Sequence, residues 1–87
     1  MATGSEIAVR AREQLVQLTG LKPGTLAALS RDEEGWHVTV VLVEMKRIPE
    51  ANDVLGDYET LLDDEGNLVS YKRTRRYYRG EVHETEE

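Results

Sequence analysis

Residues 48–79 read IPEANDVLGDYETLLDDEGNLVSYKRTRRYYR, and we expect this stretch to decide the fold. It opens with a loop at Pro49, whose nitrogen cannot donate a hydrogen bond to a sheet. Residues 53–62 predict a strand, and Asp64-Glu65-Gly66 has the composition of a tight turn into a second strand that ends near Arg79. The stretch therefore predicts a loop followed by an antiparallel hairpin.

The two strands of this hairpin carry opposite charges. With a loop at residues 64–66, we expect the cross-strand pairs Asp57–Arg73, Glu59–Tyr71, Leu61–Val69 and Leu62–Leu68. Gly56, inside the acidic strand, indicates a bulge or a close approach of the backbone. The acidic strand offsets part of the positive charge of its neighbour.

Upstream of the hairpin, the sequence predicts one helix over residues 6–19. Thr3 and Ser5 are candidates for the N-cap, and the spacing of Thr3 and Glu6 fits a capping box. Gly20 suits a left-handed residue just past the end of the helix. An apolar stripe with helical period faces the core: Ile7, Ala11, Leu15 and Leu18. Val9 and Val16 lie on the opposite side, either as scattered exposed side chains or as a seam for a partner.

Two further strands are expected over residues 25–31 and 36–47, joined by a turn at residues 32–35. This turn predicts the pairs Ser30–Val38, Ala28–Val40 and Leu26–Leu42, with the longer strand in the centre of the sheet. The predicted fold class is therefore α+β: a single N-terminal helix packed on a four-stranded antiparallel meander. We expect residues 1–5 to form an N-terminal cap, residues 6–80 the domain, and residues 81–87 an acidic, solvated tail.

Composition limits the classes of function. The chain has 87 residues, a net charge of −6 and no cysteine, which excludes disulfides and argues against bulk attraction to nucleic acid. No apolar run approaches the roughly 18 residues of a membrane span, and no secretion signal is visible, so we expect a cytoplasmic protein.

No arrangement of residues typical of catalysis is present. The sequence lacks a nucleophile–base pair at recognisable spacing and a glycine-rich phosphate loop, so we expect no enzyme activity and no cofactor. His37 and His83 have no partners at ligand spacing, so no metal site is expected. Asp53, Asp57 and Glu59 are explained more simply by arginines across the hairpin than by acid–base catalysis.

The basic strand at residues 71–79 is the clearest functional signal. Strict alternation places one set on one face, namely Tyr71, Arg73, Arg75 and Tyr77, and a second set on the other, namely Lys72, Thr74, Arg76 and Tyr78. Three interpretations stay open. The strand binds a partner protein, since Tyr and Arg are favoured at hot spots; or it stacks nucleic-acid bases; or it is a charged edge that prevents aggregation.

The ordered motifs resemble the gas vesicle protein O family (GvpO). The resemblance rests on DEEGW at 32–36, VTV at 38–40, VEMKRIP at 43–49, DVLGDYE at 53–59 and the basic strand through Gly80, with the helix ending LTG at 18–20. It covers roughly residues 6–80. Some members carry a long charged N-terminal extension that this sequence lacks, so no role of that extension is carried over.

The resemblance implies an accessory protein needed to assemble gas vesicles, the gas-filled protein shells that give microbial cells buoyancy. It implies other gas vesicle accessory or shell proteins as partners, and an AAA-type ATPase is one candidate. A regulator of gas vesicle gene expression that binds nucleic acid, and a minor structural component that self-associates weakly through a strand edge, are the alternatives. We expect the partner-binding residues to be Arg47, Ile48, Pro49, Tyr71, Lys72, Arg73, Arg75, Arg76, Tyr77 and Arg79.

Overall fold

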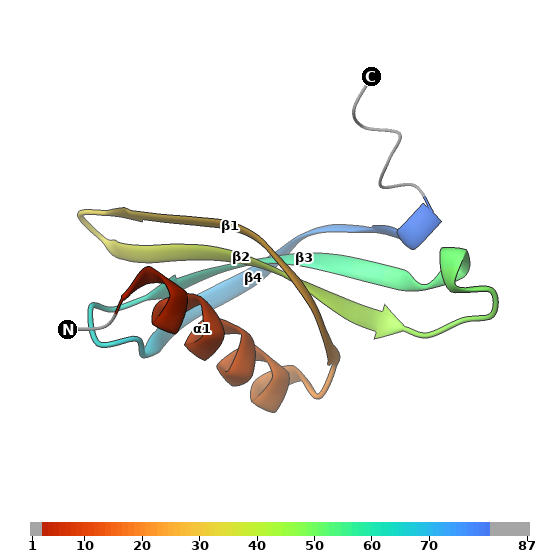
Figure 1. Ribbon diagram of the computed structural model, residues 1–87, viewed down its shortest axis with the longest axis horizontal. Helices are drawn as coiled ribbons and strands as arrows, with labels where there is room; N and C mark the ends of the chain where they lie inside the picture. The colour runs from red at the N-terminus through yellow and green to blue at the C-terminus, as the bar shows by residue number, and fades with distance from the viewer. Residues whose placement is uncertain (1–2, 81–87) are drawn as a thin grey trace, which may run out of the picture.

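The chain forms one helix followed by a four-stranded antiparallel sheet, as expected for the α+β class (Figure 1). The computed structural model describes residues 3–80, so the expected acidic tail lies outside the described residues. The elements are α1 (Gly4–Thr19), β1 (Lys22–Asp32), β2 (Gly35–Met45), a 3-10 turn η1 (Glu50–Asn52), β3 (Val54–Leu62) and β4 (Leu68–Tyr78). Sheet order follows chain order, β1-β2-β3-β4, which places β4 at an edge and β2 and β3 inside.

Local sequence sets the limits of α1. The Thr3 hydroxyl accepts a hydrogen bond from the Glu6 N–H, and the Glu6 carboxylate accepts one from the Thr3 N–H, which confirms the capping box. At the other end Gly20 adopts φ 75°, where a side chain would be strained. The helix begins two residues earlier than the sequence predicts, because the cap residue is Thr3.

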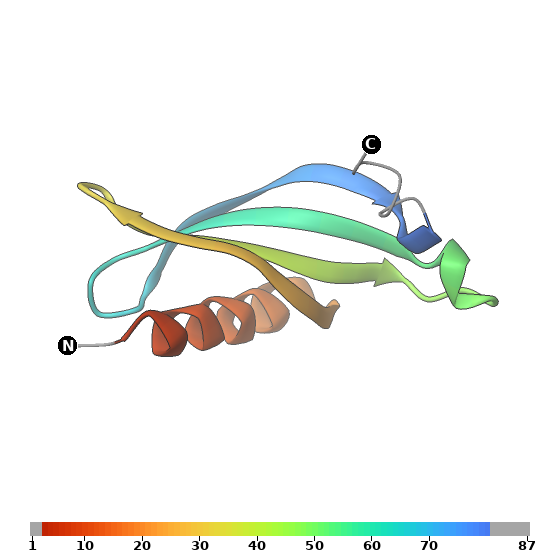
Figure 2. The same cartoon turned by 45° about the horizontal axis from the view of Figure 1, so that its top comes forward.

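The main core lies between α1 and one face of the sheet, which we call the inner face (Figure 2). From the helix, Ile7, Ala11 and Leu15 are completely buried. They pack against apolar side chains of the two inside strands: Val38, Val40, Leu42, Tyr58 and Leu62. Leu18, expected in the same stripe, is 62% exposed because it lies in the last turn of the helix.

The two valines on the other side of α1 have different environments. Val9 is exposed, whereas Val16 is partly buried against the core. A partner-facing seam through both residues is therefore not a continuous exposed surface.

The expected register of the first hairpin is wrong. Asp32 pairs with Gly35, so the loop holds only Glu33 and Glu34, and Leu29 rather than Ser30 lies opposite Val38. Two irregularities in β1 shift the pairing again, so that Leu26 lies opposite Val40 and Pro23 opposite Leu42. A turn shorter by one residue and two bulges are not visible in the alternation of side chains.

The second hairpin begins in the expected register at Leu62–Leu68 and then departs from it. Further pairs are Leu61–Ser70, Glu59–Lys72 and Asp57–Arg75, so the other three expected pairs are wrong. The shift between Asp57–Arg75 and Tyr58–Arg73 leaves Thr74 as an extra residue on β4. This bulge reverses the faces of the strand beyond it, because side chains alternate with a period of two.

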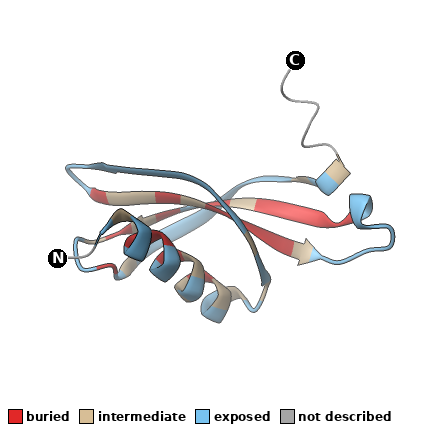
Figure 3. Ribbon diagram, viewed as in Figure 1, coloured by how far each residue is buried: buried red, intermediate tan, exposed pale blue. Residues whose placement is uncertain are grey.

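The opposite face of the sheet, which we call the outer face, carries a second apolar cluster. Val41, Val43 and Leu55 are buried there, with Tyr77 packed against them. Figure 3 shows that the buried residues of β3 extend past the part of the sheet that α1 covers. Within residues 3–80, no helix is long and apolar enough to cross a membrane.

Candidate functional site

The chain is arranged so that one end of the sheet is basic. Figure 1 shows the two hairpin turns at one end, and the β2–β3 loop, η1 and the end of β4 at the other. We call this second end the basic end and define it by six cations: Lys46, Arg47, Arg73, Arg75, Arg76 and Arg79. Arg47 and Arg76 line one shallow hollow of about 350 Å³ together with Val54, Tyr77 and Tyr78. The structure thus brings the expected loop residues and the end of the basic strand together.

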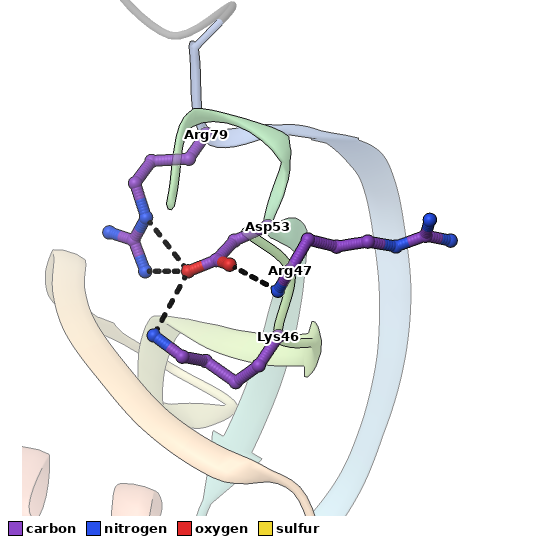
Figure 4. Close-up of polar contacts among 4 residues, drawn as sticks. All are labelled: Lys46, Arg47, Asp53 and Arg79. Atoms are coloured by element: carbon purple, nitrogen blue, oxygen red, sulfur yellow. Dashed lines mark hydrogen bonds and ion pairs between the residues drawn. The ribbon is translucent and has the colours of Figure 1, made fainter. Parts of the chain in front are cut away.

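Asp53 holds the β2–β3 loop to β4 (Figure 4). Its side chain is completely buried, and its Oδ1 accepts a hydrogen bond of 2.7 Å from the Arg47 N–H. Its Oδ2 accepts from Lys46 Nζ at 3.3 Å and from Arg79 Nη2 at 3.1 Å. The Arg47 N–H, and then the Lys46 and Arg79 cations, hold the pKa of the Asp53 carboxyl below its usual range.

This anchoring presents the rest of the loop to solvent. Ile48 is 97% exposed and precedes Pro49 through a cis peptide bond. Figure 4 shows the Arg47 side chain extending away from Asp53, although its backbone N–H points at the carboxylate. The expected residues Arg47, Ile48 and Pro49 are therefore accessible on a loop whose base is fixed.

Glu44 makes a second carboxylate centre, on the inner face beyond α1. It is the extra residue of a bulge in β2, since Val43 pairs with Leu55 and Met45 with Val54. Its carboxylate accepts hydrogen bonds from Tyr58 Oη at 2.8 Å and Arg73 Nη1 at 3.0 Å, and Arg76 Nε lies 3.3 Å away. Burial, followed by the hydrogen bond to Glu44, raises the pKa of Tyr58 to about 12.

Gly56 makes room for this centre. A Cβ on Gly56 would overlap Glu44 Oε2 and press on the Tyr58 ring. The sequence predicted a bulge or a close backbone approach at Gly56; the close neighbours are instead the side chains of Glu44 and Tyr58. The glycine is needed for the position of the Glu44 carboxylate.

Asp57 makes a third centre, on the outer face. Its carboxylate accepts a hydrogen bond of 2.8 Å from Tyr77 Oη, and Arg75 Nη1 lies 4.0 Å away. The Arg75 guanidinium stacks over the Tyr77 ring, 4.8 Å from its centroid. Burial, followed by the hydrogen bond to Asp57, raises the pKa of Tyr77 to about 12.

These contacts correct the expected faces of the basic strand. Tyr71 and Arg73 lie on the inner face as a pair, but Arg75 and Tyr77 lie with Lys72 on the outer face, because Thr74 is bulged. Arg76 joins Arg73 at Glu44 on the inner face. Tyr71 and Lys72 lie farther along β4, opposite Thr60 and Glu59, so they are not part of the basic end.

Among residues 3–80, the carboxylates neutralise only part of this positive charge. Glu44 contacts two cations, Arg73 and Arg76, and Asp53 contacts two others, Lys46 and Arg79. Counted over these residues, each of the two centres has an excess of one positive charge. Within residues 3–80, neither Arg47 nor Lys72 forms an ion pair with a carboxylate.

The β1–β2 turn brings together three possible metal ligands that the sequence analysis missed. One ligand atom each from Asp32, Glu34 and His37 lies within 4.8 Å of the others, contrary to the expectation that His37 has no partner at ligand spacing. All three side chains lie at the protein surface, and His37 Nε2 is 2.9 Å from Asp32 Oδ1. The Glu34 N–H, and then His37, hold the pKa of Asp32 below its usual range. These contacts are those of a hydrogen-bonded turn.

Glu44 is the site residue that sequence reasoning did not single out. It stands inside the expected family motif at 43–49, and it is the only charged residue between Gly35 and Lys46. A lone carboxylate in an otherwise apolar or neutral strand is a usable signal, because such a group needs a partner when it is partly buried. Its partners, in contrast, are 14 to 32 residues away and are set by the sheet.

Comparison with known proteins gives one consistent result. Residues 2–83 match the family described as gas vesicle synthesis protein GvpO. Gas vesicle protein O of Streptomyces sp. (strain CB03234) is 40% identical over 67 residues, which are 77% of this chain and 52% of the relative. Gas vesicle protein O of Haloferax mediterranei is 35% identical over 81 residues, covering 92% of this chain and 58% of the relative.

A third relative is similar to this chain over a larger share of its own length. Gas vesicle protein O1 of Halobacterium salinarum is 33% identical over 82 residues, covering 94% of this chain and 69% of the relative. The chain thus spans between about half and two thirds of the length of these relatives. No solved structure matches it.

Proposed function

This chain belongs to the gas vesicle synthesis protein GvpO family, and from that premise we propose that it acts in gas vesicle synthesis as a non-enzymatic protein-binding module. Its docking surface is the basic end together with the neighbouring residues Ile48, Pro49, Tyr71, Lys72 and Tyr77. The partner is an accessory or shell protein of the gas vesicle that presents carboxylates. An ATPase of the assembly machinery is one such partner.

One observation carries this proposal. Among the described residues, Glu44 and Asp53 each hold two cations, so both centres are positive in a chain whose net charge is −6. The guanidinium groups of these centres are about half exposed, and their positions are set by the carboxylate behind them. Cations held in place lose less conformational freedom when they meet an acidic surface, which favours association.

The tyrosines support a protein partner more than a nucleic acid. One face of the Tyr77 ring lies against Arg75, and the Tyr77 hydroxyl is bound to Asp57. Tyr58 is buried, and Tyr71 lies 6.4 Å from it between ring centroids. Stacking of successive bases needs open aromatic faces in a row, and these rings do not offer one.

Recovery of partners from cells tests the proposal. A tagged chain expressed in cells that carry the rest of the gas vesicle gene cluster is expected to retain a gas vesicle protein. Arg47→Gln with Lys72→Gln removes two exposed cations without breaking an ion pair, and we expect recovery to fall by roughly threefold or more. A control, Arg12→Gln with Arg31→Gln, makes the same charge change on α1 and at the β1–β2 turn, away from the surface, and is expected to retain the partner.

Two results would contradict the proposal. Equal recovery with both double variants would remove the assigned surface, provided that circular dichroism shows both to be folded. Recovery of no gas vesicle protein by the unaltered chain, at low salt and with crosslinking, would remove the binding role itself.

A further inference from the structure

The outer face of the sheet carries an apolar groove that no described element covers. The groove has a volume of about 410 Å³, and its floor is formed by Val41, Val43 and Leu55. On one side it is bordered by Gly24, Thr25 and Ala27 of β1, and on the other by Tyr77 and Arg79. Figure 2 shows α1 against the other side of the sheet, and the core residues of α1 contact only the inner face.

The two borders of the groove differ in charge. The β1 border is made of small neutral residues. The β4 border contains Arg79, and the Arg75 guanidinium lies over the adjacent Tyr77 ring. Asp57 also lines the groove, but its carboxylate already receives the Tyr77 hydroxyl and lies 4.0 Å from Arg75. The groove is therefore apolar along its floor, and the cations Arg75 and Arg79 lie along its β4 side.

The cations of that border are held before any partner arrives. Arg79 donates to Asp53 through Nε and Nη2, and its own N–H donates to the Asp53 carbonyl. Arg75 is held by its contact with the Tyr77 ring and by Asp57. Both guanidinium groups remain about half exposed. A partner carboxylate can thus meet them at little cost in side-chain entropy.

We propose that this groove binds an amphipathic segment of a partner protein, with apolar side chains on the floor and carboxylates along Arg75 and Arg79. This deepens the proposed function, on which the identity of the partner as a gas vesicle protein rests. A nucleic acid does not fit the groove, because its floor is aliphatic and the ring of Tyr77 is already stacked on one face. The groove selects for a segment that is acidic along one side.

Arg31 supplies a matched control for Arg75. Arg75 and Arg31 are 56% and 52% exposed, and each pairs with one carboxylate and lies over an aromatic ring. Arg31 pairs with Asp64 at the turns, at the end of the sheet opposite the basic end (Figure 1). Arg75→Gln and Arg31→Gln therefore remove the same charge, and only Arg75→Gln removes it from the border of the groove.

The probe is a synthetic helical peptide with leucine at positions i, i+3, i+4 and i+7 and glutamate along one flank. We expect its addition to the isotopically labelled chain to shift the nuclear magnetic resonance signals of Val41, Val43, Leu55 and Tyr77. The same peptide with lysine in place of glutamate is expected to give no such shifts. Arg75→Gln should weaken binding of the acidic peptide by roughly threefold or more, whereas Arg31→Gln should leave it unchanged.

Several results would overturn the inference. Equal shifts with the lysine peptide, shifts confined to the inner face, or equal weakening by both variants would each exclude the assigned groove. Broadening of the same four signals without peptide, with a dimer in sedimentation, would make a second copy of the chain the occupant and reject a partner segment. Binding of the peptide without recovery of any gas vesicle protein from cells would leave the groove in place and reject the proposed function instead.

Discussion

At the scale of single residues, three carboxylates organise the surface that was expected from the cations alone. Glu44, Asp53 and Asp57 each bind side chains from a different strand or loop. The arginines of β4 therefore each contact a carboxylate from another strand. The sequence singled out these cations as a group, and their role in binding stays a prediction. The carboxylates decide where each cation points.

The first prediction concerns how the stabilisation by Asp53 depends on pH. Its pKa is lowered in the folded state, so its contribution to stability is present above the unfolded pKa, near 3.8, and is lost as the pH falls through the folded value. We expect Asp53→Asn to be less stable at pH 7 and to lose less of its free energy of unfolding on acidification. Urea unfolding between pH 7 and pH 2.5 measures both quantities.

The control for this variant is Glu33→Gln, which removes one charge from an exposed turn residue. Its free energy of unfolding at pH 7 is expected to stay within about 0.5 kcal/mol of that of the unaltered chain. Parallel pH profiles for the Asp53→Asn variant and the unaltered chain would show that Asp53 does not hold the loop as described.

At the scale of elements, the contact between α1 and the β3–β4 turn fixes the helix along the sheet. Gln14 Nε2 donates to the Gly66 carbonyl at 2.9 Å, and Gln14 Oε1 accepts from the Leu68 N–H at 2.9 Å. Arg10 Nε donates to the same Gly66 carbonyl at 3.0 Å. Gly66 adopts φ 90°, and a side chain there would strike Arg10. The turn and the helix thus depend on each other.

Removal of the Gln14 amide gives the second prediction. In Gln14→Ala the Leu68 N–H loses its acceptor while the Gly66 carbonyl keeps Arg10, so we expect a loss of about 1 kcal/mol in the free energy of unfolding. Gln17→Ala is the matched control, because Gln17 is an exposed residue of the same helix. It is expected to change stability by less than about 0.5 kcal/mol. Equal effects of the two variants in urea unfolding would contradict the bridging role.

Among the strands, bulges explain why the alternation of side chains predicted the wrong faces. Glu44 is an extra residue in β2, and Thr74 is an extra residue in β4. Each one changes the face on which the following side chains lie. Without the bulge at Thr74, the arginines at 73 and 75 would share one face, as alternation predicts; with it, the basic strand supplies cations to both faces.

At the scale of the whole molecule, charge is separated between the two ends of the sheet. The turns carry six acids beside one cation, Arg31: Asp32, Glu33, Glu34, Asp63, Asp64 and Glu65. The opposite end carries the six cations of the basic end beside four acids: Glu44, Glu50, Asp53 and Asp57. Such a distribution orients the chain when it approaches a charged partner. It also explains how an acidic protein can present a basic surface.

Whole-sheet architecture gives a prediction for hydrogen exchange. The strands β2 and β3 are paired on both sides, whereas β1 and β4 have one open edge each. We expect the slowest exchange in β2 and β3, at residues that also carry buried side chains, such as Val40, Leu42 and Tyr58. Amides of β4 that exchange as slowly as those of β3 would show that the β4 edge is covered in solution, for instance by a second copy.

From the sequence by itself, the helix with its caps, the presence and order of the four strands, and the family of the chain could all be determined. These depend on residues close together in the chain, such as Thr3 with Glu6, or the glycines that end each turn. The separation of charge between turns and loop was likewise visible, because each group of charges is contiguous.

Only the tertiary structure decided the register, the faces of the basic strand and the carboxylate that each cation meets. The alternation of side chains along a strand does not reveal where an extra residue lies. Whether a residue forms a bulge depends on its hydrogen bonds with the neighbouring strand. Glu44 therefore meets Arg73 and Arg76, and Asp57 meets Arg75, only because the whole sheet places Thr74 outside the ladder.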